Sequence, residues 1–145
     1  FEGGDEGVGL NVDLIQARFE DIGQSLERLE EMRGVPRDQF LADQDMLDVA
    51  CYRLLVAIEA ALQICFHVSA QRLQRAPEAY AECFALLGED GILPSELSRN
   101  LQQMARFRNM LVHVYWQGDY DRVYDVLQAH LGDLRAFVRA VGELL

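Results

Sequence analysis

The 145-residue sequence contains no lysine, so all thirteen of its basic residues are arginines. Aspartate and glutamate number 24, which gives a formal net charge of −11 at pH 7. A surface with this charge repels nucleic acid at long range, because attraction to phosphates dominates most non-specific binding. The composition therefore excludes a protein that coats nucleic acid, but it leaves room for a small, focused anion site.

Proline and cysteine are also scarce, at three residues each, while half of the residues are hydrophobic. This balance is typical of a globular protein rather than a disordered one, and the length suits a single domain with its own core. The cysteines, Cys51, Cys65 and Cys83, form no CxxC pair. We predict small buried side chains rather than a disulfide framework or a zinc site.

Long apolar runs and targeting signals are missing as well. No uninterrupted apolar run approaches the roughly 18 residues that a membrane-spanning helix needs, and the sequence does not begin with a basic region followed by an apolar one. We therefore expect a cytoplasmic protein without a membrane partner. Residues 1–11 are rich in glycine and acid, and we expect a flexible leader or tag remnant that precedes a helical domain of residues 12–145.

Apolar residues recur at alternating steps of three and four, which is the mark of amphipathic helices. This spacing predicts helices over residues 12–34, 47–68, 77–87, 94–114 and 119–145. No segment alternates apolar and polar residues over a useful length. We predict an all-α fold, an up-and-down four-helix bundle with one additional short helix.

Glu59 lies in the most apolar part of the second helix, where residues 56–62 are otherwise apolar or small. A half-buried carboxylate normally needs a partner to remain ionised. We predict that Glu59 is bonded to an arginine or a backbone amide, and a direct catalytic role is the alternative.

The densest group of chemically useful side chains lies between residues 106 and 116. Arg106, Asn109 and His113 would share one polar ridge of a helix, and Arg108 would lie on a stripe beside it. On an ideal helix Arg108 and His113 are about 140° apart. They meet at one phosphate only through the reach of Arg108, through a helix end near His113, or in a site completed by another subunit.

An arginine and a histidine are sufficient for RNA cleavage without a metal or cofactor. His113 would take the proton of the ribose 2′-OH or give one to the leaving 5′-oxygen, and Arg108 would stabilise charge on the phosphorane-like transition state. Asn109 and Arg106 would orient the phosphate. These residue types also occur on ordinary helix surfaces, and the familiar enzyme motifs GxGxxG, P-loop and HExxH are absent. His67 and His130 show no partners in the sequence pattern and are interpreted as structural.

Residues 108–115 read Arg-Asn-Met-Leu-Val-His-Val-Tyr, and this segment resembles the Arg-x4-His-x-Tyr motif of the HepT-like toxins of the HEPN superfamily. The similarity extends to the central helix around residues 53–64, to residues 80–94 before the motif helix, and to residues 123–127 after it. Gln63 is a departure, since an acid is commoner there in the family. Only a supporting helix contact is affected by that difference.

The resemblance implies an endoribonuclease toxin that works as a homodimer, with catalytic residues Arg108 and His113 in a composite cleft and Glu59 in support. It implies a minimal nucleotidyltransferase antitoxin that transfers AMP units to Tyr115, which adds bulk and negative charge beside the site for RNA phosphate. Two alternatives stay open. One is a non-catalytic helical subunit that binds nucleotide phosphate and regulates a nucleotidyltransferase, and the other is a bundle that serves only as a scaffold.

Overall fold

The computed structural model describes residues 9–113, 116 and 118–145. These residues form helices and no strand, which confirms the all-α prediction. The helices are α2 (Val12–Arg33), α3 (Arg37–Leu41), α4 (Gln44–Val68), the π-helix η1 (Ser69–Leu73), α5 (Tyr80–Glu89), α6 (Ser95–Leu111), α7 (Tyr120–Ala129) and α8 (Leu131–Gly142).

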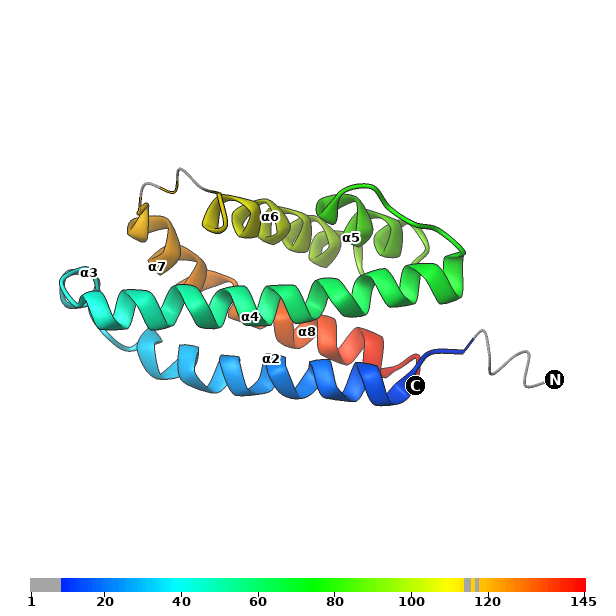
Figure 1. Ribbon diagram of the computed structural model, residues 1–145, viewed down its shortest axis with the longest axis horizontal. Helices are drawn as coiled ribbons and strands as arrows, with labels where there is room; N and C mark the ends of the chain where they lie inside the picture. Colours follow the sequence, from blue (N-terminus) through cyan, green and yellow to red (C-terminus); the bar gives the residue numbers. More distant parts are fainter. Residues whose placement is uncertain (1–8, 114–115, 117) are drawn as a thin grey trace.

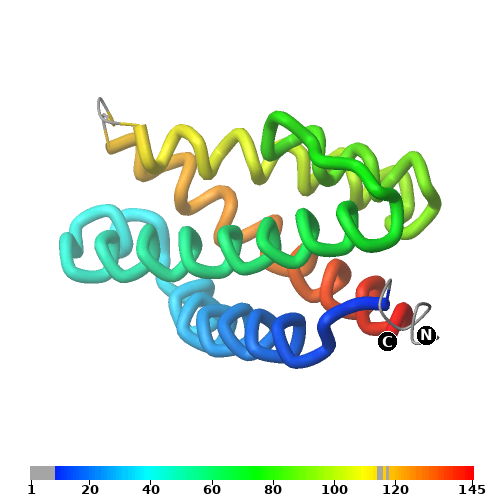
Figure 2. Tube along the Cα trace, turned by 45° about the vertical axis from the view of Figure 1, so that its right-hand side comes forward, coloured from blue at the N-terminus to red at the C-terminus, as the bar shows by residue number. Residues whose placement is uncertain are grey.

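Four rows of helices make up the bundle (Figure 1). Helices α2 and α4 run antiparallel along one side, α6 lies on the far side of α4, and α7 and α8 together fill the fourth row. The short helix α5 packs against α6. Figure 2 shows the chain end at α8 beside the beginning of α2. The predicted bundle is confirmed, with the fourth row divided between two helices.

Helix α4 is the centre of the bundle, as its apolar sequence predicts. It contacts helices on every side, including α2, α5, α6 and α8, and its buried residues include Leu54, Ala57, Ile58, Ala61 and Ile64. Together, α4 and η1 are also long and apolar enough to cross a membrane, judged by length and composition alone. The search for uninterrupted apolar runs did not predict this. Half of the most apolar window of these helices is buried inside the molecule, and the core helix of a soluble protein passes the same test.

Three of the helices begin at a side chain that caps the first turn. Asn11, Asp43 and Asp119 each accept a hydrogen bond from the backbone N–H three residues later, at 3.1–3.3 Å. Such a bond satisfies one of the amides that a helix leaves unpaired at its start. Asn11 lies at the end of the predicted leader, so the ordered fold includes this residue.

The last predicted helix, residues 119–145, is divided at His130. The backbone there leaves the helical conformation, with φ −124° and ψ 3°. The imidazole bonds to Asp133 at 2.9 Å, and an acid in the first turn of α8 favours a new helix start. Periodicity missed the division because the apolar positions continue in step on both sides of it.

Two further boundaries differ from the prediction. Helix α5 begins at Tyr80 instead of Pro77, because Ala79 is extended and the N–H of Glu78 donates to the Glu82 carboxylate at 3.1 Å. The link around Phe40 contains the short helix α3, whose Phe40 is fully buried. The start of α5 and the five-residue helix α3 could not be predicted from periodicity, because neither involves a long run of periodic apolar residues.

Candidate functional site

Helix α6 carries the arginine-rich segment, and its position is fixed by a close approach to α5. The Ser98 hydroxyl donates to the Phe84 carbonyl oxygen at 2.9 Å in the buried seam between the two helices. A Cβ atom at Gly88 would lie 2.4 Å from the Ser98 Oγ. Glycine is therefore required there, and the contact holds the end of α5 against the first turn of α6. At the other end of this helix pair, Tyr80 at the start of α5 contacts Arg108 in the last turn of α6.

The exposed side of α6 carries only part of the predicted ridge. Arg106 and Asn109 are exposed, as expected, and Gln102 is half-buried beside them. The helix ends at Leu111 rather than continuing to Val114, so His113 does not belong to this ridge. The prediction of one continuous polar face was wrong at its end.

A tight turn replaces the expected last turn of α6. The N–H of His113 donates to the Met110 carbonyl at 3.2 Å, and the N–H of Trp116 donates to the His113 carbonyl at 3.0 Å. The β-branched Val112 and Val114 flank His113 in the sequence, and such residues lower helix propensity. One of the three ways to bring Arg108 and His113 together, a helix end near His113, is therefore present.

Arg108 is held by groups from three helices. Its Nε donates to Glu59 Oε2 at 2.5 Å, and its Nη2 forms an ion pair with the same oxygen. The Tyr80 ring lies under the guanidinium, with Arg108 Cζ 4.5 Å from the ring centroid. Nη1 donates to the Asn109 Oδ1 at 3.2 Å. The guanidinium is thus fixed along one edge and over one face.

This arrangement corrects the predicted location of Arg108. The sequence placed it on a stripe flanking a solvent-facing ridge, whereas only 16% of its side chain is exposed. Burial of the charge is compensated by Glu59, whose own side chain is 34% exposed. The predicted pairing of Glu59 with an arginine is confirmed, and its partner is Arg108.

Tyr80 is the site residue that sequence reasoning missed. It is the first residue of α5, and its ring contacts Arg108 of α6, which is distant from it in the sequence. No local pattern indicates such a contact. The one available signal was its place in residues 80–94, which resemble the segment before the motif helix in the HepT-like family.

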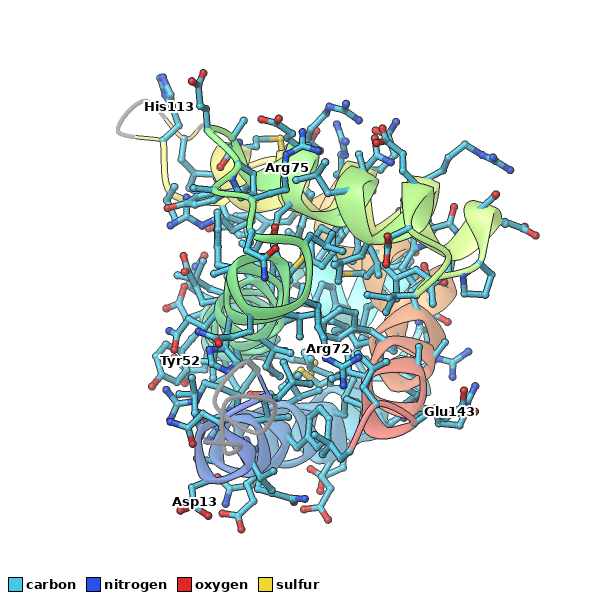
Figure 3. The ribbon with its side chains drawn as sticks, turned by 90° about the vertical axis from the view of Figure 1, so that its right-hand side faces the viewer. Asp13, Tyr52, Arg72, Arg75, His113 and Glu143 are labelled. Atoms are coloured by element: carbon cyan, nitrogen blue, oxygen red, sulfur yellow. The ribbon has the colours of Figure 1, made fainter. Side chains whose placement is uncertain are left out.

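His113 lies on the surface at the end of α6. Figure 3 shows it on the same side of the molecule as Tyr52 of α4. Tyr52 and Val112 are large hydrophobic residues with exposed fractions of 61% and 45%. Tyr115 lies outside the described residues.

The other two histidines have structural partners, which the sequence pattern did not show. The His67 Nε2 accepts a hydrogen bond from the N–H of Asn11 at 2.8 Å, and burial lowers the pKa of its ring. His130 bonds to Asp133, as described above. Both contacts hold helix ends, in agreement with their structural interpretation.

The cysteines are free thiols, as predicted. Cys65 and Cys83 are buried, and burial raises the pKa of Cys65. Cys51 is half-buried, and its pKa is raised to about 11, first by burial and then by the nearby Asp48. Within the described part of the chain, no three His, Cys, Asp or Glu residues gather in a way that could hold a metal ion.

Trp116 and Tyr120 pack against one another, with their rings perpendicular and 5.8 Å apart. Both are half-buried against the core. This contact joins Trp116 to the start of α7.

A cavity of about 170 Å³ lies on another side of α6, between this helix and α7. It is lined by Asn100, Gln103, Met104, Phe107, Arg122, Asp125, Val126 and His130. Arg108 and His113 are not among them. The arginine and the histidine of the motif are therefore not enclosed by this cavity.

Comparison with known proteins places this geometry in context. A family model described as "Ribonuclease HepT-like" matches residues 22–141. The mRNA nuclease HepT of Shewanella oneidensis is 29% identical over 129 residues, which cover 89% of this chain and 96% of that protein. The tRNA nuclease HepT of Aphanizomenon flos-aquae is 26% identical over 132 residues, covering 91% and 90%.

A solved structure of a HEPN toxin is also similar to this chain. The tri-AMPylated HEPN toxin of Shewanella oneidensis, in complex with its MNT antitoxin, superposes with a TM-score of 0.82 at 27% identity. The match covers 90% of this chain and 98% of that one.

Proposed function

Because this chain belongs to the HepT-like family of ribonucleases, we propose that it is the toxin of a toxin–antitoxin pair and that it cleaves RNA with Arg108 and His113. One observation carries the assignment of these residues. Arg108 is held by Glu59 and Tyr80 at the last turn of α6, and His113 stands exposed immediately beyond that turn. The proposed action on RNA supports our further proposal of a cytoplasmic location.

The proposed chemistry is transfer of the phosphodiester to the ribose 2′-oxygen. The 2′-oxygen forms a bond to phosphorus while the bond to the 5′-oxygen breaks. His113 takes the proton of the 2′-OH or supplies one to the leaving 5′-oxygen. Arg108 donates to the non-bridging oxygens as negative charge builds on them. Proton transfer and charge stabilisation are both supplied by side chains, so the scheme requires no metal.

Asn109 and Arg106 are assigned to orienting the phosphate. Asn109 already contacts the Nη1 of Arg108, so its amide is next to the position that a phosphate oxygen would take. Arg106 lies exposed on the adjacent turn. Arg106 adds positive charge beside Arg108 in a chain that is otherwise acidic.

The working unit is proposed to be a homodimer. Arg108 and His113 are not enclosed by the cavity between α6 and α7, and exclusion of water is needed for strong electrostatic catalysis. Tyr52 and Val112 are large hydrophobic residues that are exposed, and Figure 3 draws Tyr52 and His113 along one surface of the molecule. A second copy covering this surface would enclose both motifs and bring an arginine of one chain toward a histidine of the other.

The antitoxin is proposed to be a minimal nucleotidyltransferase that adds AMP to Tyr115. The Shewanella toxin, of similar fold, is tri-AMPylated and in complex with its MNT antitoxin. Modification of Tyr115 would place phosphate two residues from His113. Co-expression with the antitoxin should raise the intact mass by about 329 Da for each AMP unit, mapped to the peptide that contains Tyr115. Modification mapped only to another residue would contradict the assignment.

The decisive experiment uses the purified chain without its antitoxin and with divalent metal removed. We expect it to cleave a structured RNA, and we expect His113→Ala and Arg108→Ala to lower the rate by at least about 100-fold. Arg139→Ala is the control, because Arg139 is exposed on α8 and its loss changes the net charge as Arg108→Ala does. Binding of nucleotide without cleavage by the wild-type chain would instead support the regulatory-subunit alternative.

A further inference from the structure

Residues of three helices contact the guanidinium of Arg108, and one of them, Tyr80 of α5, lies outside the Arg-x4-His-x-Tyr motif. We propose that Tyr80 is a positioning residue, whose ring fixes the plane of the guanidinium so that one defined edge meets the RNA phosphate. This inference rests on the proposed ribonuclease function. Tyr80 acts through Arg108 and is not assigned contact with RNA.

The donors of Arg108 are divided between protein and solvent. A guanidinium has five N–H donors in one plane. Glu59 accepts from the edge formed by Nε and Nη2, and Asn109 accepts from Nη1. One donor on Nη1 and one on Nη2 remain. The remaining Nη2 donor points along the end-on edge of the guanidinium, and a guanidinium edge matches the spacing of two phosphate oxygens.

The ring of Tyr80 fixes what the hydrogen bonds leave free. The two short contacts to Glu59 lie along one edge, and the bond to the exposed Asn109 is longer, at 3.2 Å, so the guanidinium plane can still tilt about the Glu59 edge. Stacking at 4.5 Å from Cζ to the ring centroid blocks the tilt on one side and attracts the cation. The end-on edge is thereby held at one angle, and misplacement of a catalytic group by about 1 Å can cost about 100-fold in rate.

Tyr80 is itself held independently of Arg108. Its ring packs edge-on against Phe66 of α4, with centroids 5.8 Å apart and an interplanar angle of 74°. Helix α5, which begins at Tyr80, is fixed to α6 by the Ser98–Phe84 hydrogen bond and by the close contact at Gly88. The ring is therefore a rigid surface on which the arginine rests, rather than a side chain that follows it.

The test compares Tyr80→Phe, which keeps the ring, with Tyr80→Leu, which removes it. In single-turnover cleavage of RNA we expect Tyr80→Phe to stay within about twofold of wild type and Tyr80→Leu to lose at least about tenfold in rate. The RNA concentration for half-maximal rate should change less than about threefold, because the charge of Arg108 remains. Equal rates for Leu and Phe variants would overturn the proposal.

Tyr124→Leu is the matched control. It removes another arginine–tyrosine stack, with Arg37 Cζ 4.7 Å from the ring centroid, on α7 away from Arg108. Both leucine variants should lose stability, and only Tyr80→Leu should lose the cleavage rate. An equal loss of rate in the two would show a general structural effect. If Tyr80→Leu does not fold, Tyr80→Met keeps a flexible apolar chain and carries the same prediction.

A readout without RNA separates this proposal from the proposed function. In ¹⁵N spectra of arginine side chains, the Nε–H signal of Arg108 should be protected and sharp in wild type and in Tyr80→Phe. It should broaden and exchange faster in Tyr80→Leu. If the wild-type protein does not cleave RNA but the spectra differ in this way, the ribonuclease proposal is wrong and the positioning role of Tyr80 is supported. If the wild-type protein cleaves RNA and the Arg108 signal is the same in Tyr80→Leu as in wild type, the positioning role of Tyr80 is wrong.

Discussion

Neutralising Glu59 should change RNA affinity and the rate of cleavage in opposite directions. Glu59→Gln keeps the shape and one acceptor for Arg108 but removes the negative charge. The guanidinium, with 16% of its side chain exposed, is then positive without a compensating carboxylate. An RNA phosphate no longer competes with Glu59, whereas the edge that Glu59 held becomes free to move.

The size of each effect follows from the exposure of the pair. Hydrogen bonds to charged groups contribute about 1.5–3 kcal/mol, and exposed ion pairs contribute about 0–1 kcal/mol. The half-buried Glu59–Arg108 pair lies between these cases, so we expect a loss of about 1–2 kcal/mol in the free energy of unfolding and a Tm lower by about 3–8 °C. Removal of one negative charge near the phosphate should tighten RNA binding by about five- to tenfold, and misorientation should lower kcat by about tenfold.

The assay measures kcat and KM for RNA cleavage, together with thermal unfolding, for Glu59→Gln and for Glu30→Gln. Glu30 pairs with Arg135 and Arg33, and its side chain is 33% exposed against 34% for Glu59. The two variants remove the same charge from carboxylates of similar exposure, whereas the arginine partners of Glu30 are the more exposed. Both should lose stability, and only Glu59→Gln should lower KM and kcat together. Identical kinetics for the two would refute a role for Glu59 in the site.

Three other changes test separate parts of the structure. Asn109→Asp places a carboxylate 3.2 Å from Arg108 Nη1, so it should lower kcat/KM for RNA about tenfold. Asn109→Ala should lower kcat/KM only about two- to threefold, and equal losses in the two variants would contradict this geometry. The pKa of Cys51 is raised to about 11 by burial, so a thiol reagent at pH 8 should label it rapidly only in the unfolded chain. Burial lowers the pKa of His67 in the folded chain below 6.5, so the unfolded chain binds the proton more tightly and stability falls as the pH drops through 6.5 toward the folded pKa. His67→Gln should flatten that part of the curve of unfolding free energy against pH, and an unchanged slope would show that His67 does not cause it.

The sequence was sufficient for the bundle because its helices are long and their buried positions are local in spacing. Helix α4 is the clearest case, since its apolar residues mark both its length and its central place. Boundaries were less predictable. The division at His130 and the end of α6 at Leu111 depend on single backbone conformations that interrupt no apolar pattern.

The candidate site was predictable only in its residue types. Arg108, Asn109 and His113 are close together in the sequence, which is why they were predicted as site residues. The surroundings of Arg108 are formed by residues that are distant from it in the sequence. Glu59 meets Arg108 across 49 positions, and Tyr80 meets it from a third helix. Periodicity describes one helix at a time, so it located Arg108 beside a solvent-facing ridge, predicted a partner for Glu59 without identifying Arg108, and missed Tyr80.

The charge of the site explains why a small modification could inhibit it. Between residues 94 and 116, three arginines face one glutamate, a local charge of +2 in a chain of −11. Glu59 is paired with one of these arginines, and counting it leaves +1. An AMP unit joined through a phosphodiester brings about one negative charge. One unit on Tyr115, as proposed, would cancel the local charge, and further units would reverse its sign, so RNA would be repelled by the site as well as by the rest of the surface.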